Sequence, residues 1–148
     1  MITTVTPNGT LRSRPMVTQS FTGDGELWFF MSDDSGKARD LAQEHGVNVS
    51  YTDAAQNRFV SVSGNAVVRK DRQKIQQLWR PELERFFPAG VDDPHLALLC
   101  VRVDTAEYWD ARSGKMLTLE NAGDASALTD RPLGDHTRVA IRATPTSG

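Results

Sequence analysis

The sequence of 148 residues contains a single cysteine and no long apolar run. One cysteine excludes an internal disulfide and fits a reducing compartment. Because Cys100 lies within the apolar segment 98–101, we expect a buried and unreactive thiol. No apolar segment approaches the roughly 20 residues that a membrane-spanning helix needs, and the N-terminus lacks the pattern of a signal peptide. The sequence therefore predicts a cytoplasmic protein without a membrane partner.

The chain also lacks an excess of charge of either sign. Seventeen Lys and Arg residues oppose 19 Asp and Glu residues, which gives a formal net charge of −2. Proteins that bind nucleic acids or membrane surfaces usually carry a basic excess, so the balance argues against both kinds of partner. Apolar residues make up 39% of the chain and charged residues 24%, as in soluble globular proteins.

Aromatic residues are missing from the C-terminal part of the chain. Residues 118–148 contain no Phe, Trp or Tyr, so this segment has little to bury. We therefore expect a domain over residues 1–117 and a tail over residues 118–148. The tail is predicted to be mobile or to contribute an edge strand, for which the alternating run 138–142 is the candidate.

Before residue 117, most segments have the apolar patterns of strands. These patterns predict strands over 2–6, 11–21 and 26–32 and around 47–51, 60–68 and 99–103. Asn8-Gly9 predicts a tight hairpin between the first two strands. Gly64 interrupts its strand, which indicates a bulge or a point of close approach.

Two helices are expected among the strands. Ser35 and Asp71 are suitable N-caps, and Pro81 should end or kink the second helix. Many short strands with two or three short helices favour a small barrel of the mainly β or α+β class.

The usual catalytic motifs are absent. The chain has no Gly-x-Ser-x-Gly, no phosphate-binding loop and no Rossmann glycine pattern. The three histidines lack the spacing of metal ligands, so we predict no metal site. Since no side chain stands out as a general acid or base, any chemistry would come from a cofactor.

Two polar features could bind an anion. Alternation places Arg12 and Arg14 on one face of a strand, which either is solvated or needs an anion between the two guanidinium groups. Ser35 and Lys37 lie where a helix begins and could bind a phosphate. The alternative there is a simple cap beside a surface lysine.

Aromatic side chains form a third feature. Trp28, Phe29 and Phe30 share one strand, and Tyr108-Trp109 follow another. Such residues belong to a core or form a wall against a planar ring. With the two polar features, they match what a phosphorylated planar heterocycle would require.

The order of these motifs resembles the pyridoxamine 5′-phosphate oxidase-like FMN-binding split barrels. The first group of resembling segments is 3–5, 8–9, 11–16, 27–32 and 35–37. A second group resembles the general stress protein 26 branch of that superfamily. It consists of 60–66, 78–79, 87–90, 93–94 and 107–109.

The resemblance implies a six-stranded split β-barrel with two to three short helices, forming a homodimer with FMN at the subunit interface. It assigns the cofactor phosphate to Arg12, Arg14, Ser35 and Lys37. It assigns the isoalloxazine ring to the chain around Ser13, Pro15, Met16, Trp28, Phe29, Phe30 and Ser32. Trp109 would close the site, with either subunit as its source. Related split barrels use F420, FAD or haem instead of FMN.

The function implied is that of an FMN-binding general stress protein acting as a flavin-dependent oxidoreductase on a small-molecule redox partner. The alternatives are a non-catalytic protein that binds or senses flavin, a reductase that uses F420 or FAD, and an interaction domain with an empty site. In this branch a helix precedes the first strand, whereas here a strand is expected from Ile2. We therefore expect either an upstream start or a barrel without that cover.

Overall fold

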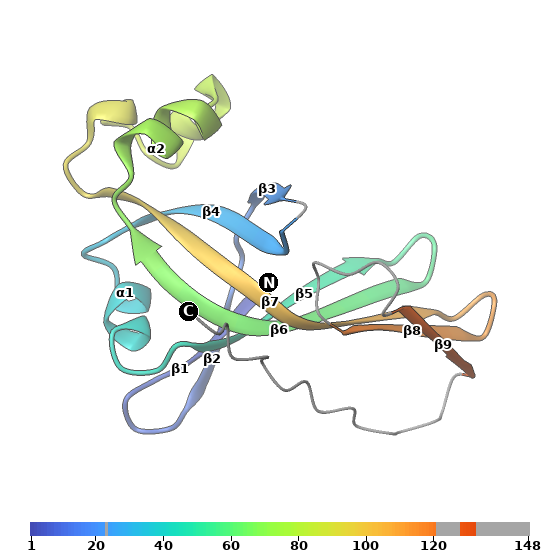
Figure 1. Ribbon diagram of the computed structural model, residues 1–148. Helices are drawn as coiled ribbons and strands as arrows, with labels where there is room; N and C mark the ends of the chain where they lie inside the picture. The colour runs from blue at the N-terminus through green and yellow to red at the C-terminus, as the bar shows by residue number, and fades with distance from the viewer. Residues whose placement is uncertain (23, 121–127, 133–148) are drawn as a thin grey trace, which may run out of the picture.

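The computed structural model describes residues 1–22, 24–120 and 128–132 (Figure 1). Its strands are β1 (Ile2–Val5), β2 (Leu11–Arg14), β3 (Thr18–Thr22), β4 (Glu26–Ser32), β5 (Gly46–Asp53), β6 (Arg58–Arg69), β7 (Leu96–Asp110), β8 (Lys115–Glu120) and β9 (Leu128–Pro132). Its helices are α1 (Gly36–Leu41) and α2 (Arg72–Leu78), with 3-10 turns over Pro81–Arg85 and Gly90–Asp92. Among the described helices, none is long and apolar enough to cross a membrane.

The strands form one antiparallel sheet whose two ends are joined by a very short connection. The order is β2-β1-β5-β6-β7-β4-β3, and β8 and β9 extend it from β7. β2 and β3 are consecutive in the chain but lie at opposite ends of this order. Only residues 15–17 connect them, and the step from Arg14 to Thr18 can span at most about 14 Å. The sheet must therefore curl until its edges approach each other, which confirms a split β-barrel with more strands than the six expected.

The connection between β2 and β3 corrects one prediction. A single strand over 11–21 was expected, whereas the structure has two strands that pair with different partners. β2 pairs with β1, and β3 pairs with β4. Pro15 has no backbone N–H and ends the ladder, so the chain leaves one edge of the sheet and joins the other. The hairpin at Asn8-Gly9 is confirmed, with Gly9 at a φ of 82°.

The strand β4 separates two apolar cores. Phe29 and Leu27 face the barrel interior, where they pack with side chains of β6 and β7. Trp28 and Phe30 face the other side and pack against Ile75 of α2 and the adjacent 3-10 turn. This two-sided burial explains the continuous apolar run in the sequence and confirms that β4 is covered on both faces.

The thiol of Cys100 belongs to the second core, as expected. It is buried, and burial raises its pKa to about 11. The thiolate is therefore scarce at neutral pH, which confirms the interpretation of an unreactive side chain.

A bulge occurs where β6 passes β7, at the position that Gly64 indicated. The register shifts between Ser63, which lies opposite Thr105, and Gly64, which lies opposite Val103. Asp104 is the extra residue on β7. A Cβ atom on Gly64 would lie 2.1 Å from the carbonyl oxygen of Arg102, so the two backbones approach more closely than any other residue type permits.

The boundary expected at residue 117 falls inside β8 (Lys115–Glu120), which pairs with the distal half of β7. β9 follows within the segment that was expected to be a tail. In Figure 1 these strands lie at the end of the sheet remote from α2. The run 138–142 lies outside the described residues, and the mobility of the tail stays a prediction.

The close approach at Gly64 predicts a specific loss of stability. Gly64→Ala should lower the free energy of unfolding by about 2 kcal/mol, because its Cβ atom meets backbone and not a flexible side chain. Urea denaturation monitored by circular dichroism measures the effect. Gly46→Ala is the matched control, since its Cβ atom would meet nothing within 4 Å. Equal stabilities of the two variants would contradict the prediction.

Candidate functional site

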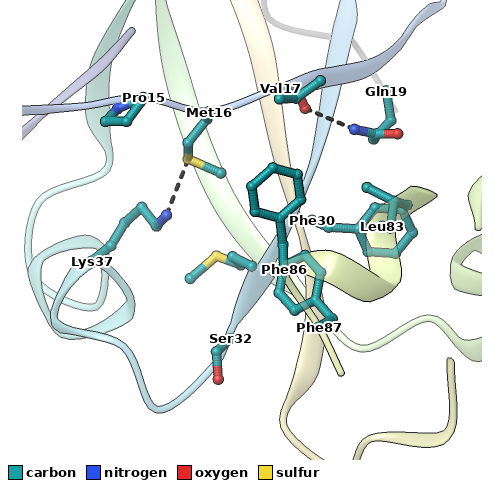
Figure 2. A pocket seen from close by; sticks show the side chains of 11 residues that line it. Pro15, Met16, Val17, Gln19, Phe30, Ser32, Lys37, Leu83, Phe86 and Phe87 are labelled. Atoms are coloured by element: carbon teal, nitrogen blue, oxygen red, sulfur yellow. Dashed lines mark hydrogen bonds between the residues drawn. The ribbon is translucent and has the colours of Figure 1, made fainter. Parts of the chain in front are cut away.

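A pocket of about 360 Å³ opens beside the short connection between β2 and β3. One wall is the connection with the start of β3, a second is the end of β4, and a third is the segment after α2. Figure 2 shows that these walls surround an open space into which Lys37 points from α1. The lining residues are Pro15, Met16, Val17, Gln19, Phe30, Met31, Ser32, Lys37, Leu83, Phe86 and Phe87.

The split of the barrel creates this pocket. β3 pairs with β4 only from Glu26 to Phe29, so none of the described strands lies against that edge of β4 over residues 30–32. Backbone groups of residues 30 and 31 that face this edge are therefore available to a ligand, whereas the carbonyl of Ser32 already accepts from the Ser35 amide at 3.3 Å. The pocket combines an open strand edge with an apolar floor.

The aromatic wall is fixed by its own packing. The ring of Phe30 lies edge-on to Trp79, with 5.6 Å between centroids, and 6.2 Å from Phe87. Phe86 lies beside them with 55% of its surface exposed. A wall built from a buried and an exposed phenyl ring suits a flat apolar ligand.

Lys37 is a charged residue among the mostly apolar residues that line the pocket. Its amine donates to the sulfur of Met16 at 3.1 Å, and within the residues that the structure describes no carboxylate pairs with it. Burial and, second, the nearby guanidinium of Arg14 lower the pKa of Lys37. A half-buried cation with only a thioether as partner indicates that an anion belongs here.

Arg14 has an anionic partner within the chain itself. Its Nη2 lies 2.8 Å from the carboxylate of Asp40 and its Nη1 donates to Thr4 at 2.8 Å. Asp40 is only 5% exposed, and the hydrogen bond from Arg14 is the main cause that lowers the pKa of Asp40. The charge of Arg12 lowers it further. Of the two alternatives for this arginine pair, the exposed Arg12 fits a solvated face, whereas Arg14 has an anionic partner within the chain, which was not predicted.

The structure brings some of the predicted site residues together and leaves others apart. Pro15, Met16, Phe30, Ser32 and Lys37 line the pocket, and Arg14 acts on Lys37 through its charge. Ser35 is confirmed as the N-cap of α1, since its hydroxyl accepts from the Ala38 amide at 3.3 Å.

Other predicted residues lie away from the pocket walls. Arg12 and Ser13 are exposed on β2. Trp28, with Lys74 5.0 Å above its ring, belongs to the second core, and Phe29 belongs to the barrel interior. Their side chains have the core role that was the alternative, which leaves only their backbone for a ligand. Trp109 pairs with Phe59 beyond the bulge.

Several lining residues were not predicted. Val17 and Gln19 come from the segment that was expected to continue one strand. Leu83, Phe86 and Phe87 lie beyond Pro81, where the second helix was expected to end or kink, and a 3-10 turn over Pro81–Arg85 places them at the pocket. The available signal was the pair of adjacent phenylalanines directly before Pro88.

A polar cluster at the end of β4 was also missed. The imidazole Nδ1 of His95 lies 3.0 Å from one oxygen of Asp33, and Lys70 forms an ion pair with the other. Asp34 lies near enough that the three side chains have the spacing of a metal site. The ammonium group of Lys70 already neutralises this carboxylate, and the pKa of Asp33 is lowered chiefly by that hydrogen bond.

Comparisons with known proteins agree with this geometry. A model of the pyridoxamine 5′-phosphate oxidase-like family matches residues 1–131. The chain is 29% identical over 117 residues to protein bli-3 of Neurospora crassa, a match that covers 73% of this chain and 56% of that protein. The chain thus spans little more than half the length of this curated relative.

Similar solved structures include the following two. A protein from Clostridium acetobutylicum, related to general stress protein 26 and of the pyridoxinephosphate oxidase family, has a TM-score of 0.71 at 21% identity. The match covers 81% of this chain and 83% of that one. The general stress FMN/FAD binding protein of Xanthomonas citri has a TM-score of 0.61 at 29% identity, with 74% and 78% coverage. These likenesses confirm the split-barrel fold.

The buried pair of Arg14 and Asp40 predicts a pH-dependent contribution to stability. Asp40→Asn should lower the free energy of unfolding by about 2 kcal/mol at pH 7, because it leaves a partly buried guanidinium without its counter-charge. The pKa of Asp40 in the folded protein is depressed below its ordinary value of 3.8. The difference in the free energy of unfolding between wild type and variant should therefore have its full size above that pH. It should shrink as the pH falls towards the folded pKa.

Urea denaturation at pH 7 and at successively lower pH measures both effects. Asp104→Asn is the control, because Asp104 is exposed and accepts a surface hydrogen bond from Asn65, so its effect should stay within about 0.5 kcal/mol. If the loss of stability in Asp40→Asn did not change with pH, the ion pair between Arg14 and Asp40 would not be its cause.

Proposed function

This chain belongs to the pyridoxamine 5′-phosphate oxidase-like family, and on that premise we propose that it is an FMN-binding general stress protein acting as a flavin-dependent oxidoreductase. The observation that carries the proposal is Lys37, a half-buried cation in a pocket with aromatic walls, to which no carboxylate in the described part of the chain pairs. A phosphorylated planar ring satisfies both the charge and the walls. The Xanthomonas citri relative, which is described as an FMN/FAD binding protein, supports the same cofactor class.

The cationic side of the pocket fits a phosphate. Lys37 supplies one ammonium group. Arg14 uses two of its five N–H donors on Thr4 and Asp40, so it keeps donors for a ligand. Arg12 and Ser35 are assigned to the same phosphate. Because Asp40 holds the guanidinium of Arg14 in place, the site would be formed before the cofactor binds.

The apolar side of the pocket fits an isoalloxazine ring. Pro15 and Met16 form one surface, and Phe30 forms the floor beneath it. Ser13 and the strand edge around Ser32 are assigned to the polar rim of the ring, and Trp28 and Phe29 contribute through their backbone alone. Bound FMN would supply hydride exchange with a nicotinamide or another small acceptor. The chain would bind and orient the ring, and Phe86 would exclude water from one face.

The pocket is exposed at its rim, which supports a homodimer with the cofactor at the interface. Val17 and Phe86 are 60% and 55% exposed there. A second copy of the chain would cover both residues and could bring in its own Trp109, which is remote from the pocket in a single chain. The rival function is a non-catalytic protein that binds or senses flavin, for which NADH or NADPH would not reduce the bound cofactor.

The proposed site predicts both a spectrum and an affinity difference. The purified full-length protein should show a flavin absorption spectrum and release a molecule with the mass of FMN on denaturation. Lys37→Gln should weaken FMN binding by about 10- to 100-fold, since a charge-assisted contact contributes roughly 1.5–3 kcal/mol. Fluorescence titration of the cofactor-free protein measures this change.

Lys70→Gln is the matched control, because Lys70 pairs with Asp33 outside the pocket. If denaturation released FAD or F420, the proposed site would stand but its cofactor would not be FMN. A colourless protein that took up none of the three would overturn the proposal and leave an interaction domain. Binding without reduction by either nicotinamide would favour the non-catalytic protein.

If Trp109 closes the FMN site, its side chain should contribute to FMN binding, either in its own subunit or in the partner subunit. Trp109→Leu should weaken FMN binding, whereas Phe59→Leu, at the residue opposite Trp109 on β6, should not. A mixed dimer joins one Lys37→Gln chain to one Trp109→Leu chain. If Trp109 acts on the partner's pocket, one site of this dimer has both Lys37 and Trp109 intact, and the other site lacks both. Titration of separately tagged mixed dimers should therefore show half of the sites at wild-type affinity. Weak binding at every site would contradict the contribution from the partner.

A further inference from the structure

The amine of Lys37 is placed as a nucleophile for a carbonyl compound as well as a cation for a phosphate. We propose that, in the cofactor-free protein, Lys37 forms an imine with an aromatic aldehyde that enters the pocket. This activity goes beyond the proposed flavin function. It rests on the surroundings of one nitrogen atom and on the walls of the pocket that contains it.

The contacts of Lys37 leave its amine available. Its partner is the sulfur of Met16 at 3.1 Å, and a thioether is a weak acceptor that a ligand displaces easily. Burial and the charge of Arg14 lower the pKa of Lys37, so a larger share of the amine is unprotonated at neutral pH than for an exposed lysine. An unprotonated amine is the form that attacks a carbonyl carbon.

Two other lysines provide an internal comparison. Lys70 forms an ion pair with Asp33, and its side chain is half exposed. The ammonium of Lys74 lies over the ring of Trp28, at 5.0 Å from its centre. Neither amine lines the pocket, so an aldehyde bound in the pocket would not be held close to either of them.

The reaction balances without an oxidant or a reductant. The nitrogen of Lys37 adds to the carbonyl carbon, a C=N bond replaces the C=O bond, and the carbonyl oxygen leaves as water with two protons from the amine. The neutral imine removes a positive charge from an apolar setting beside Arg14. That relief favours the product here more than at an exposed lysine.

The walls of the pocket select an aromatic aldehyde over an aliphatic one. Phe30, Phe86 and Phe87 present their rings to the same space as the amine (Figure 2). The volume of about 360 Å³ accommodates a ligand of one or two rings. A planar aldehyde stacked on this wall keeps its carbonyl near Lys37, which raises the effective concentration of the reactive pair.

Reductive trapping tests the proposal. The cofactor-free full chain is incubated with benzaldehyde at pH 7.5, reduced with sodium cyanoborohydride and mapped by peptide mass spectrometry. Because the chain has four lysines, each adduct is assigned directly. We expect at least about tenfold greater occupancy at Lys37 than at Lys70 or Lys74, owing to proximity in the pocket. Equal occupancy at the three lysines would overturn the proposal.

Two variants separate the chemistry from the shape of the pocket. Lys37→Arg keeps the charge but cannot form the imine, so the selective adduct should disappear while circular dichroism stays unchanged. Phe86→Ala should reduce labelling by benzaldehyde and leave labelling by propanal unaltered, because only the aromatic aldehyde uses the ring. Equal loss for both aldehydes would contradict the aromatic selectivity.

Saturation with FMN before labelling separates this proposal from the flavin function. If both proposals hold, bound FMN protects Lys37 and the adduct is lost. If FMN fails to bind, labelling of Lys37 in the cofactor-free protein is unaffected, and only the flavin function falls. If FMN binds but the cofactor-free protein gives no selective adduct, only the imine proposal falls.

Discussion

The structure depends on a topological constraint: three residues connect the two strands at opposite ends of the sheet. Because β2 and β3 must lie within reach of this connection, the sheet closes almost completely and leaves a split where no strand pairs across. The same constraint leaves the end of β4 without a partner on one side and places Met16 over it. The pocket is therefore a direct consequence of how the barrel closes.

The buried cluster of Arg14, Asp40 and Thr4 connects this closure to the site. Asp40 belongs to α1, whereas Arg14 and Thr4 belong to the two strands at one edge of the sheet. Their hydrogen bonds hold the helix against the barrel, and the same helix carries Lys37. A short helix of six residues has little stability of its own, so the position of the lysine depends on this ionic contact. The cluster thus has a structural role and also leaves Lys37 as the cation that needs an external anion.

The sequence predicted the local features well because they depend on neighbouring residues. Alternation located most strands, the Ser35 and Asp71 caps located the helices, and Gly64 marked the bulge. The family resemblance added the split barrel, which no local pattern contains.

The pairing of Arg14 with Asp40 could not be predicted, because the two residues come together only when α1 folds back on the sheet edge. Phe30 was predicted as part of an aromatic wall, but Phe86 and Phe87 were missed for a similar reason, since only the 3-10 turn before them places them at the split.

The bulge between β6 and β7 also sets which way the far end of the sheet faces. Successive side chains of a strand alternate between its faces, so the extra residue Asp104 inverts the alternation for the rest of β7. Val101 and Val103 face the barrel before the bulge and Ala106 faces it afterwards. The face of the sheet to which Trp109 points thus depends on the extra residue at the bulge. During evolution, position 104 should accept many residue types, whereas the loss of one residue there would turn every following side chain to the opposite face.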